Sequence, residues 1–280
     1  MFNNQSTGSS LPHLVKILTC SIKDADILTI KLRNFFIVVL GFLFMCGAVA
    51  NAAQMDPQSR LVEADGYRML GESTKSIVEV TELEDEKLKR AELYEVYSKQ
   101  GKGSLVVFKS AADAGQKMLM LDDKFWMFLP RTRRPIRITP MQKLLGDASA
   151  GDLSALSWSE SYEIDGAVKT VDFEGIPAVV MPLQSSTKGN TYDRIELVLS
   201  DDGNFPLKAD LYLKSGKLAK VATFEKGERE GVDVVASMKL KDSIKKNSET
   251  IISYKDSEPA EIADKLFNPS FLIKNNLDNL

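Results

Sequence analysis

Alternation of apolar and polar residues is the clearest pattern in the C-terminal half of the chain. In residues 194–200 every second position is Ile or Leu, and the residues between them are mostly polar. Residues 207–213 and 232–240 repeat this period of two, which is typical of half-buried strands. Turn signals lie between these runs, at Asp202-Gly203, Ser215-Gly216 and Lys226-Gly227. The pattern predicts an antiparallel meander with one apolar and one wet face.

An apolar face of this length must be covered, either by curling of the sheet or by helices packed on its concave side. Three segments are expected to be helical. The first begins at Asp56-Pro57, where an N-cap residue precedes proline, and runs to about Leu70. The second covers 140–145 with a continuation at 152–156, and the third lies within 259–272. We expect these helices to form a lid over the concave face.

Residues 118–130 break the alternation, because both faces of each expected strand are apolar. Two interpretations stay open: a central hairpin buried on both sides, or a hairpin with one face on the core and the other on a bound ligand. Nearby methionines favour the ligand wall slightly, since methionine adapts to irregular apolar partners. The pattern leaves open which face of the hairpin points inward. The candidate apolar wall is Met118, Met120, Trp126, Phe128, Leu197, Leu211 and Val234.

Residues 31–52 have the layout of an export signal. Lys31 and Arg33 precede an uncharged apolar run at 35–50, and small residues follow up to Ala52. The run is shorter than the ~20 residues that span a bilayer, so a cleaved signal is favoured over an uncleaved anchor. We expect an upstream extension and signal peptide at 1–52, cleavage near Ala52, and a single periplasmic domain at 53–280.

The exported chain is expected to lack the residue types that many catalytic centres and zinc sites use. His13, Cys20 and Cys46 are the only histidine and cysteines, and all precede Ala52. Their loss removes thiol nucleophiles, imidazole bases and Cys/His zinc sites. Residues 1–52 also carry four cations and two anions, so cleavage changes the formal charge from -3 to -5. An acidic chain is a poor nucleic-acid binder. We expect a binding protein without cofactor or metal, not an enzyme.

Four arginines lie directly after the aromatic strand, at Arg131, Arg133, Arg134 and Arg137. Guanidinium groups match phosphate and carboxylate oxygens, so these residues are candidates for contacts with a lipid head group or an acidic partner. A solvated, salt-bridged stretch is the alternative, and for a charge run it is the favoured one. Residues 101–104 read Gly-Lys-Gly-Ser but lack the spacing and following helix of a phosphate loop, which predicts a turn.

The order of motifs from Phe125 onward resembles the outer-membrane lipoprotein-sorting protein family, relatives of the LolA carrier. A Trp-containing strand ends at Pro130, an Arg-rich stretch follows at 131–138, and Gly-Asp pairs lie at 146–147 and 151–152. The family's Gly-Ser-Asp-Phe-Ser segment reads Gly-Asp-Ala-Ser-Ala here, without the aromatic residue. The resemblance spans nearly all of the mature chain. Further matches are Tyr192-Asp193-Arg194-Ile195, residues 206–212, Gly216-Lys217, Lys220, Thr250, Leu266-Phe267 and Leu272.

The resemblance implies a mainly β (α+β) fold, in which a curved antiparallel sheet forms a half-open barrel capped by a few helices. It also implies an apolar cavity for acyl chains, which cost about 0.8 kcal/mol per methylene when exposed to water. The expected function is that of a periplasmic carrier that shuttles its cargo toward the outer membrane. Its expected partners are an inner-membrane transporter or export complex that loads it and an outer-membrane acceptor. We expect a monomer that binds lipid or lipoprotein acyl chains and no nucleic acid.

Two other functions stay open at this point. The first is a regulatory module on the same fold, which senses lipid or lipoprotein and binds a membrane partner. The second is an enzyme that acts on envelope lipid through carboxylates. The carrier interpretation makes the strictest structural demand, because it requires an interior that fatty tails can enter.

Overall fold

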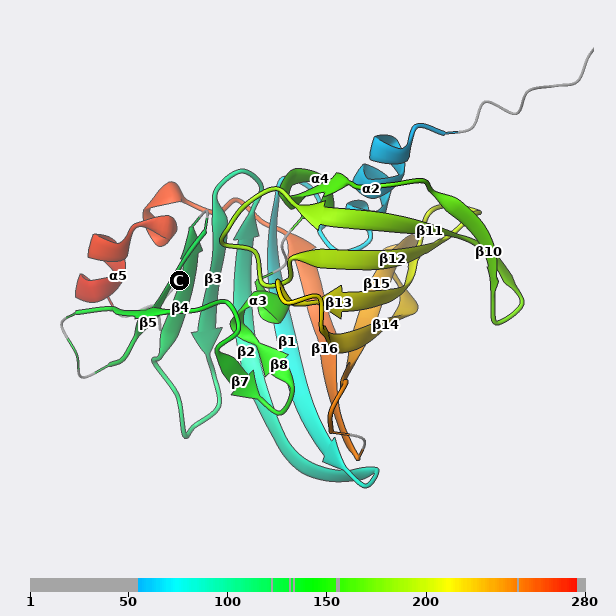
Figure 1. Cartoon of the computed structure of the whole chain (residues 1–280). Helices are drawn as coiled ribbons and strands as arrows, with labels where there is room; N and C mark the ends of the chain where they lie inside the picture. Colours follow the sequence, from blue (N-terminus) through cyan, green and yellow to red (C-terminus); the bar gives the residue numbers. More distant parts are fainter. Residues whose placement is uncertain are drawn as a thin grey trace, which may run out of the picture. The chain divides into compact units, whose positions relative to one another are not determined.

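The computed structural model describes residues 55–121, 123–130, 132, 134–154, 157–245 and 247–275. The expected extension and signal peptide at 1–52 lie outside these residues. Strands make up most of the described chain, and the helices are short (Figure 1). No helix in these ranges is both long and apolar enough to cross a membrane.

One large sheet contains nearly all of the described strands, and every pairing in it is antiparallel. Thirteen of its strands follow one another in a single order, and a fourteenth, β9 (Tyr162–Ile164), pairs with β11 (Ile176–Ser185) outside this order. The order across the sheet is β10 (Lys169–Phe173), β11 (Ile176–Ser185), β12 (Arg194–Ser200), β13 (Pro206–Tyr212), β14 (Leu218–Arg229), β15 (Val232–Asp242), β16 (Ser248–Pro259), β1 (Ser73–Glu84), β2 (Lys87–Lys99), β3 (Gly103–Phe108), β4 (Lys117–Leu121), β5 (Lys124–Phe128) and β6 (Ile136–Ile138).

The sheet is a barrel that stays open between β6 and β10. The first and last strands, β1 and β16, pair with each other in its middle. The chain between the two open edges carries a ribbon of β7 (Lys143–Leu145) and β8 (Ala148–Ser149), followed by α3 (Ala150–Leu153) and α4 (Trp158–Ser161). We call residues 143–154 the plug, because they lie inside the curve of the sheet (Figure 1). The expected half-open, mainly β architecture is confirmed.

The two faces of β2 to β5 bury different cores. On β3, Val106 and Phe108 join a large inner cluster with the plug, whereas Leu105 and Val107 face outward. The outward residues pack against the 3-10 helix η1 (Asp264–Phe267) and α5 (Pro269–Lys274), which Figure 1 draws in red beyond β3 and β4. The hairpin at 118–129 is therefore buried on both sides. The C-terminal helix is confirmed, but it covers the outer face and is no lid for the concave one.

The N-terminal helix begins where its sequence predicts but ends at Gly66, before the expected end near Leu70. α2 spans Pro57–Gly66, and the Asp56 carboxylate accepts a hydrogen bond from the Ser59 N–H at 3.2 Å. The helix buries Leu61 and Ala64 in the inner cluster. The helix expected at 140–145 is wrong, because those residues lead into strand β7. Gly146 turns the chain there at a φ of 55°, a conformation that favours glycine.

A β-bulge between β14 and β15 changes where one expected strand ends. The strands expected at 194–200, 207–213 and 232–240 are confirmed as β12, β13 and β15. The turn expected at Lys226-Gly227 is wrong, because β14 continues to Arg229. The register between β14 and β15 shifts next to Gly227, where an added Cβ would lie 2.7 Å from the Cβ of Ala236. The shift brings Val235 into the inner cluster.

Candidate functional site

The inner wall of the open barrel is apolar across its whole width. Every strand from β11 through β16 and β1 to β5, in sheet order, contributes at least one buried apolar side chain to the inner cluster. Four methionines belong to it, at positions 118, 120, 181 and 238. The elements that cover this wall are small: the plug, α4 and α2. A broad apolar wall under a thin cover is the main feature of the candidate site.

The structure places the seven expected wall residues in three environments. Met118, Met120, Leu197 and Leu211 lie together in the inner cluster. Trp126 and Phe128 lie on the outer face with η1 and α5, so their assignment to the inner wall needs correction. The reason is the alternation of β4 and β5, since Trp126 pairs with Leu119 and both point outward. Val234 is buried but belongs to neither cluster, because the bulge turns Val235 inward instead.

The arginine stretch lies only partly within the described residues. Arg131 and Arg133 lie outside them, and Arg134 is exposed. Arg137 stacks on Trp126, with its guanidinium carbon 4.8 Å from the ring centroid. This contact is on the outer face of the sheet. The expected role of Arg131, Arg133 and Arg134 in binding a head group or partner stays a prediction.

A small hollow remains between the inner wall and its cover, with a volume of about 50 Å³. Its lining includes the apolar side chains of Ile195, Leu211 and Phe224 and the charged side chains of Arg68 and Asp152. Such a volume has room for a few water molecules. Pockets for small ligands usually measure about 300–1,000 Å³. The hollow is therefore too small for an acyl chain in this conformation, and the space that a carrier requires is not open there.

A buried polar cluster ties the plug to the wall at Asp152, a residue of α3. Its carboxylate accepts hydrogen bonds from Lys220 Nζ at 2.6 Å, from the Tyr192 hydroxyl at 2.7 Å, and from the N–H and hydroxyl of Ser149 at 2.8 and 2.7 Å. Burial, followed by the charge of Asp152, raises the pKa of Tyr192 well above its ordinary value, which keeps the hydroxyl a donor. The charge of Asp152 is thus compensated inside the barrel.

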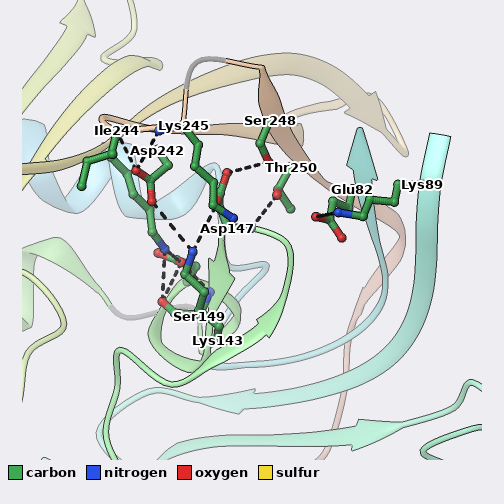
Figure 2. A network of polar contacts seen from close by, with 12 residues as sticks. Glu82, Lys89, Lys143, Asp147, Ser149, Asp242, Ile244, Lys245, Ser248 and Thr250 are labelled. Atoms are coloured by element: carbon green, nitrogen blue, oxygen red, sulfur yellow. Dashed lines mark hydrogen bonds and ion pairs between the residues drawn. The ribbon is translucent and has the colours of Figure 1, made fainter. Parts of the chain in front are cut away.

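A second polar cluster ties the plug to β16, and Figure 2 shows it from close by. Asp147 is fully buried and accepts hydrogen bonds from Lys143 Nζ and from the Ser248 hydroxyl, each at 3.2 Å. Its backbone N–H donates to Thr250 Oγ1 at 2.8 Å. An added Cβ on Gly146 would lie 2.5 Å from the same Thr250 oxygen. The turn of the β7–β8 ribbon therefore fits closely against the sheet and is held there by directional polar contacts.

Helix α4 is held by the N-terminal helix. The carboxylate of Asp65 accepts hydrogen bonds from the N–H groups of Trp158 and Ser159, at 2.9 and 2.8 Å, and from the Ser157 hydroxyl at 2.6 Å. The guanidinium of Arg68 lies over the Trp158 ring, 4.1 Å from its centroid. Trp158 itself is buried in the inner cluster.

A larger pocket of about 390 Å³ lies at the rim of the barrel, and we call it the mouth pocket. The β2–β3 turn, the β4–β5 turn, the loop after β11 and helix α4 all contribute to it. Met120, a member of the inner cluster, also lines it. Two of its loops touch, because an added Cβ on Gly189 would lie 2.0 Å from the Cβ of Asp123. The mouth pocket thus adjoins the inner wall.

The sequence reasoning gave Lys220 and Asp152 no structural role. A signal was present for Lys220, because it shares the inner face of β14 with Ala222 and Phe224, all three being buried. A lysine on an apolar face indicates a buried partner. For Asp152 the local signal is the capping-box spacing Ser149-x-x-Asp152, since Ser149 donates to this carboxylate. No local signal identifies its partners Tyr192 and Lys220, which lie 40 and 68 positions away in the chain.

Three solved structures share this fold. A LolA superfamily protein from Nitrosomonas europaea is 24% identical, with a TM-score of 0.70 over 76% of this chain and 98% of that chain. A DUF1329 family protein from Desulfovibrio piger is 22% identical, with a TM-score of 0.62 over 77% and 97%. A putative outer membrane lipoprotein-sorting protein domain from Vibrio parahaemolyticus is 19% identical, with a TM-score of 0.62 over 76% and 97%.

These similarities define the chain as a protein of LolA-like fold, as the motif order predicts. A family model with the description "Uncharacterized protein" matches residues 99–274, more than half of the chain. The chain belongs to that family. No curated protein matches the sequence.

Proposed function

We propose that the chain is a periplasmic carrier, which holds the acyl chains of a lipid or lipoprotein inside the half-open barrel and takes them toward the outer membrane. The observation that carries this proposal is the broad apolar inner wall under a thin cover. Each methylene withdrawn from water there contributes about 0.8 kcal/mol. The shared fold of a putative outer membrane lipoprotein-sorting protein domain supports the same class of cargo.

Binding requires the plug to move, because a hollow of about 50 Å³ cannot hold a fatty tail. The plug packs Leu145, Ala148, Ala150 and Leu153 against the wall. A lipid tail that takes their place exchanges one set of apolar contacts for another, so the apolar burial is retained. What must break are the polar contacts at Asp147 and Asp152. The plug then behaves as a segment that opens locally while the sheet stays folded.

The residues that we propose to contact the acyl chains are Met118, Met120, Leu197 and Leu211, which the structure brings together. Methionine side chains adapt to tails of different shape. Arg134 is exposed and is proposed to contact a partner, either the inner-membrane complex that loads the carrier or the outer-membrane acceptor. The expected export signal at 1–52 supports a periplasmic location.

One observation favours a second function, a regulatory module that senses lipid or lipoprotein and binds a membrane partner. The closed interior fits a protein that spends most of its time without cargo. In that case a tail that displaces the plug changes the surface offered to the partner. Cargo content separates the two functions, since a carrier is expected to hold lipid in stoichiometric amounts.

The test is to purify the exported protein from the periplasm, extract it with organic solvent, and identify any lipid by mass spectrometry. A fluorescent palmitoyl probe is then titrated into the extracted and refolded protein. The carrier is expected to yield about one lipid per chain and to bind the probe saturably. A protein that carries no lipid and binds no probe contradicts the proposal. Probe binding without co-purified lipid favours the sensor.

A further inference from the structure

We propose that the mouth pocket holds the head group of a zwitterionic phospholipid, with its phosphate at Lys99 and Lys102 and its ammonium group at Asp123 and Glu160. This inference rests on the proposed function, in which the acyl chains enter the barrel. It names the class of cargo, a phospholipid whose head carries both charges.

The position and size of the pocket suit the head of an amphiphile. Its volume of about 390 Å³ lies within the range of small-ligand pockets. Most of its lining is polar, but Met69 and Met120 are apolar, and Met120 belongs to the inner cluster. A molecule with its head in this pocket therefore has the inner wall next to its tails.

The cationic groups of the pocket come from the β2–β3 turn. Lys99 Nζ lies 2.6 Å from Asp264 Oδ1, and Lys102 Nζ lies 3.0 Å from Asp264 Oδ2. Hydrogen bonds from Lys99 and then from Lys102 lower the pKa of Asp264. Two ammonium groups thus share one carboxylate, which leaves one positive charge uncompensated. Each ammonium carries three N–H donors. Lys99 Nζ also donates to the Ile262 carbonyl at 3.1 Å, so Lys99 has one donor left for a phosphate oxygen, and Lys102 has more.

The anionic groups come from two other elements, Asp123 from the β4–β5 turn and Glu160 from α4. Both line the pocket. Across the described ranges, neither carboxylate has an ion pair or a hydrogen bond to another side chain. A head group with only a negative charge would meet these carboxylates unfavourably. A head that adds an ammonium group compensates them.

The test compares three lipids with the same dioleoyl chains and different heads: phosphoethanolamine, phosphoglycerol, and the free hydroxyl of diacylglycerol. Binding to the exported protein is measured by competition with the palmitoyl probe. We expect the phosphoethanolamine lipid to bind roughly two- to thirtyfold more tightly than the phosphoglycerol lipid, the range for two exposed ion pairs. The variant Asp123→Asn with Glu160→Gln is expected to lose this preference.

The control variant makes the same charge change away from the pocket, at Asp256→Asn with Glu228→Gln, and is expected to keep the preference. Equal or tighter binding of the phosphoglycerol lipid by the unchanged protein would overturn the head-group proposal and leave the carrier intact. Equal preference in both variants would overturn it too. Binding of none of the three lipids would overturn the carrier proposal itself.

Discussion

Lys220 and Asp152 form an ion pair inside the barrel, with Nζ 2.6 Å from Oδ2 and each side chain 3% exposed. Lys220 belongs to the wall strand β14, and Asp152 belongs to the plug. Moving two charges out of water is costly, and the pair is tolerated because Ser149 and Tyr192 also donate hydrogen bonds to the carboxylate. These directional contacts therefore hold the plug in one position against the wall.

We expect Lys220→Met to lower the free energy of unfolding by about 3–5 kcal/mol, because it leaves the Asp152 carboxylate buried without its counter-ion. The chain offers a matched control in Lys226 and Asp233, which also lie 2.6 Å apart but with side chains 51% and 50% exposed. Lys226→Met is expected to cost less than about 1 kcal/mol. Urea denaturation measures both variants. Similar losses in the two would show that burial of the inner pair has no special effect.

Because only one of two buried alanines lines the hollow, we expect Ala→Val to change the free energy of unfolding in opposite directions at the two positions. Ala222 lines the hollow, so Ala222→Val is expected to fill it, to raise the free energy of unfolding by up to about 1 kcal/mol, and to weaken binding of the palmitoyl probe. Ala178 is fully buried away from the hollow, and Ala178→Val is expected to cost about 1–3 kcal/mol through overpacking. Denaturation and probe titration check this pair. Equal destabilisation would mean that the hollow has no usable space.

The carboxylate of Glu95 predicts a loss of stability in acid. Burial raises its pKa, but hydrogen bonds from Lys109 and Lys75 outweigh this, so the pKa is lowered from 4.5. Because the folded-state pKa lies below the unfolded one, the contribution is complete above about pH 4.5 and is lost as the pH falls through the folded-state pKa. Glu95→Gln is expected to cost about 1 kcal/mol at pH 7.

Urea denaturation between pH 7 and pH 3 compares the Glu95→Gln variant with the unchanged protein. The difference between their free energies of unfolding is expected to shrink once the wild-type carboxyl takes up its proton. A difference that stays constant over this range would rule out the lowered pKa as its source.

Local patterning predicted the strands and two of the three turns between them, at Asp202-Gly203 and Ser215-Gly216. Period-two alternation identified β12, β13 and β15, and the Asp56-Pro57 start of α2 was found from its capping residues. Where the prediction of an inward-facing residue was wrong, the cause is a local irregularity that a period of two does not reveal. The bulge at Ala236 inverts the alternation of β15, so Val235 and not Val234 joins the inner cluster. A one-residue shift changes every later side chain to the other face.

The candidate site was harder to predict, because it depends on contacts between distant segments. The hairpin at 118–129 is apolar on both faces, and only its pairing and its neighbours decide that Met118 points inward and Trp126 outward. The plug was missed as a unit. Its strands are two and three residues long and are set by Gly146 and by polar contacts to Thr250 and Lys220, which no periodicity reveals.

Movement of the plug is the central claim, and a disulfide tests it most directly. An ideal Cβ on Gly146 lies 3.2 Å from the Cβ of Glu82 on β1, a few tenths of an ångström below the usual Cβ separation in disulfides. Because Cys20 and Cys46 both precede residue 53, Glu82→Cys and Gly146→Cys would be the only cysteines of the expected mature chain. The reduced form of the same protein is one control. The Gly146→Ala variant is the second, because its Cβ crowds Thr250 Oγ1 in the same way, at 2.5 Å, without a thiol, and it is expected to bind the probe as the reduced protein does.

Binding of the palmitoyl probe to this double variant is measured before and after reduction with dithiothreitol. The account predicts that the oxidised protein, with its plug fastened to β1, binds little probe and that reduction restores saturable binding. Equal binding in the two states would contradict it, because tails would then enter the barrel without displacement of the plug.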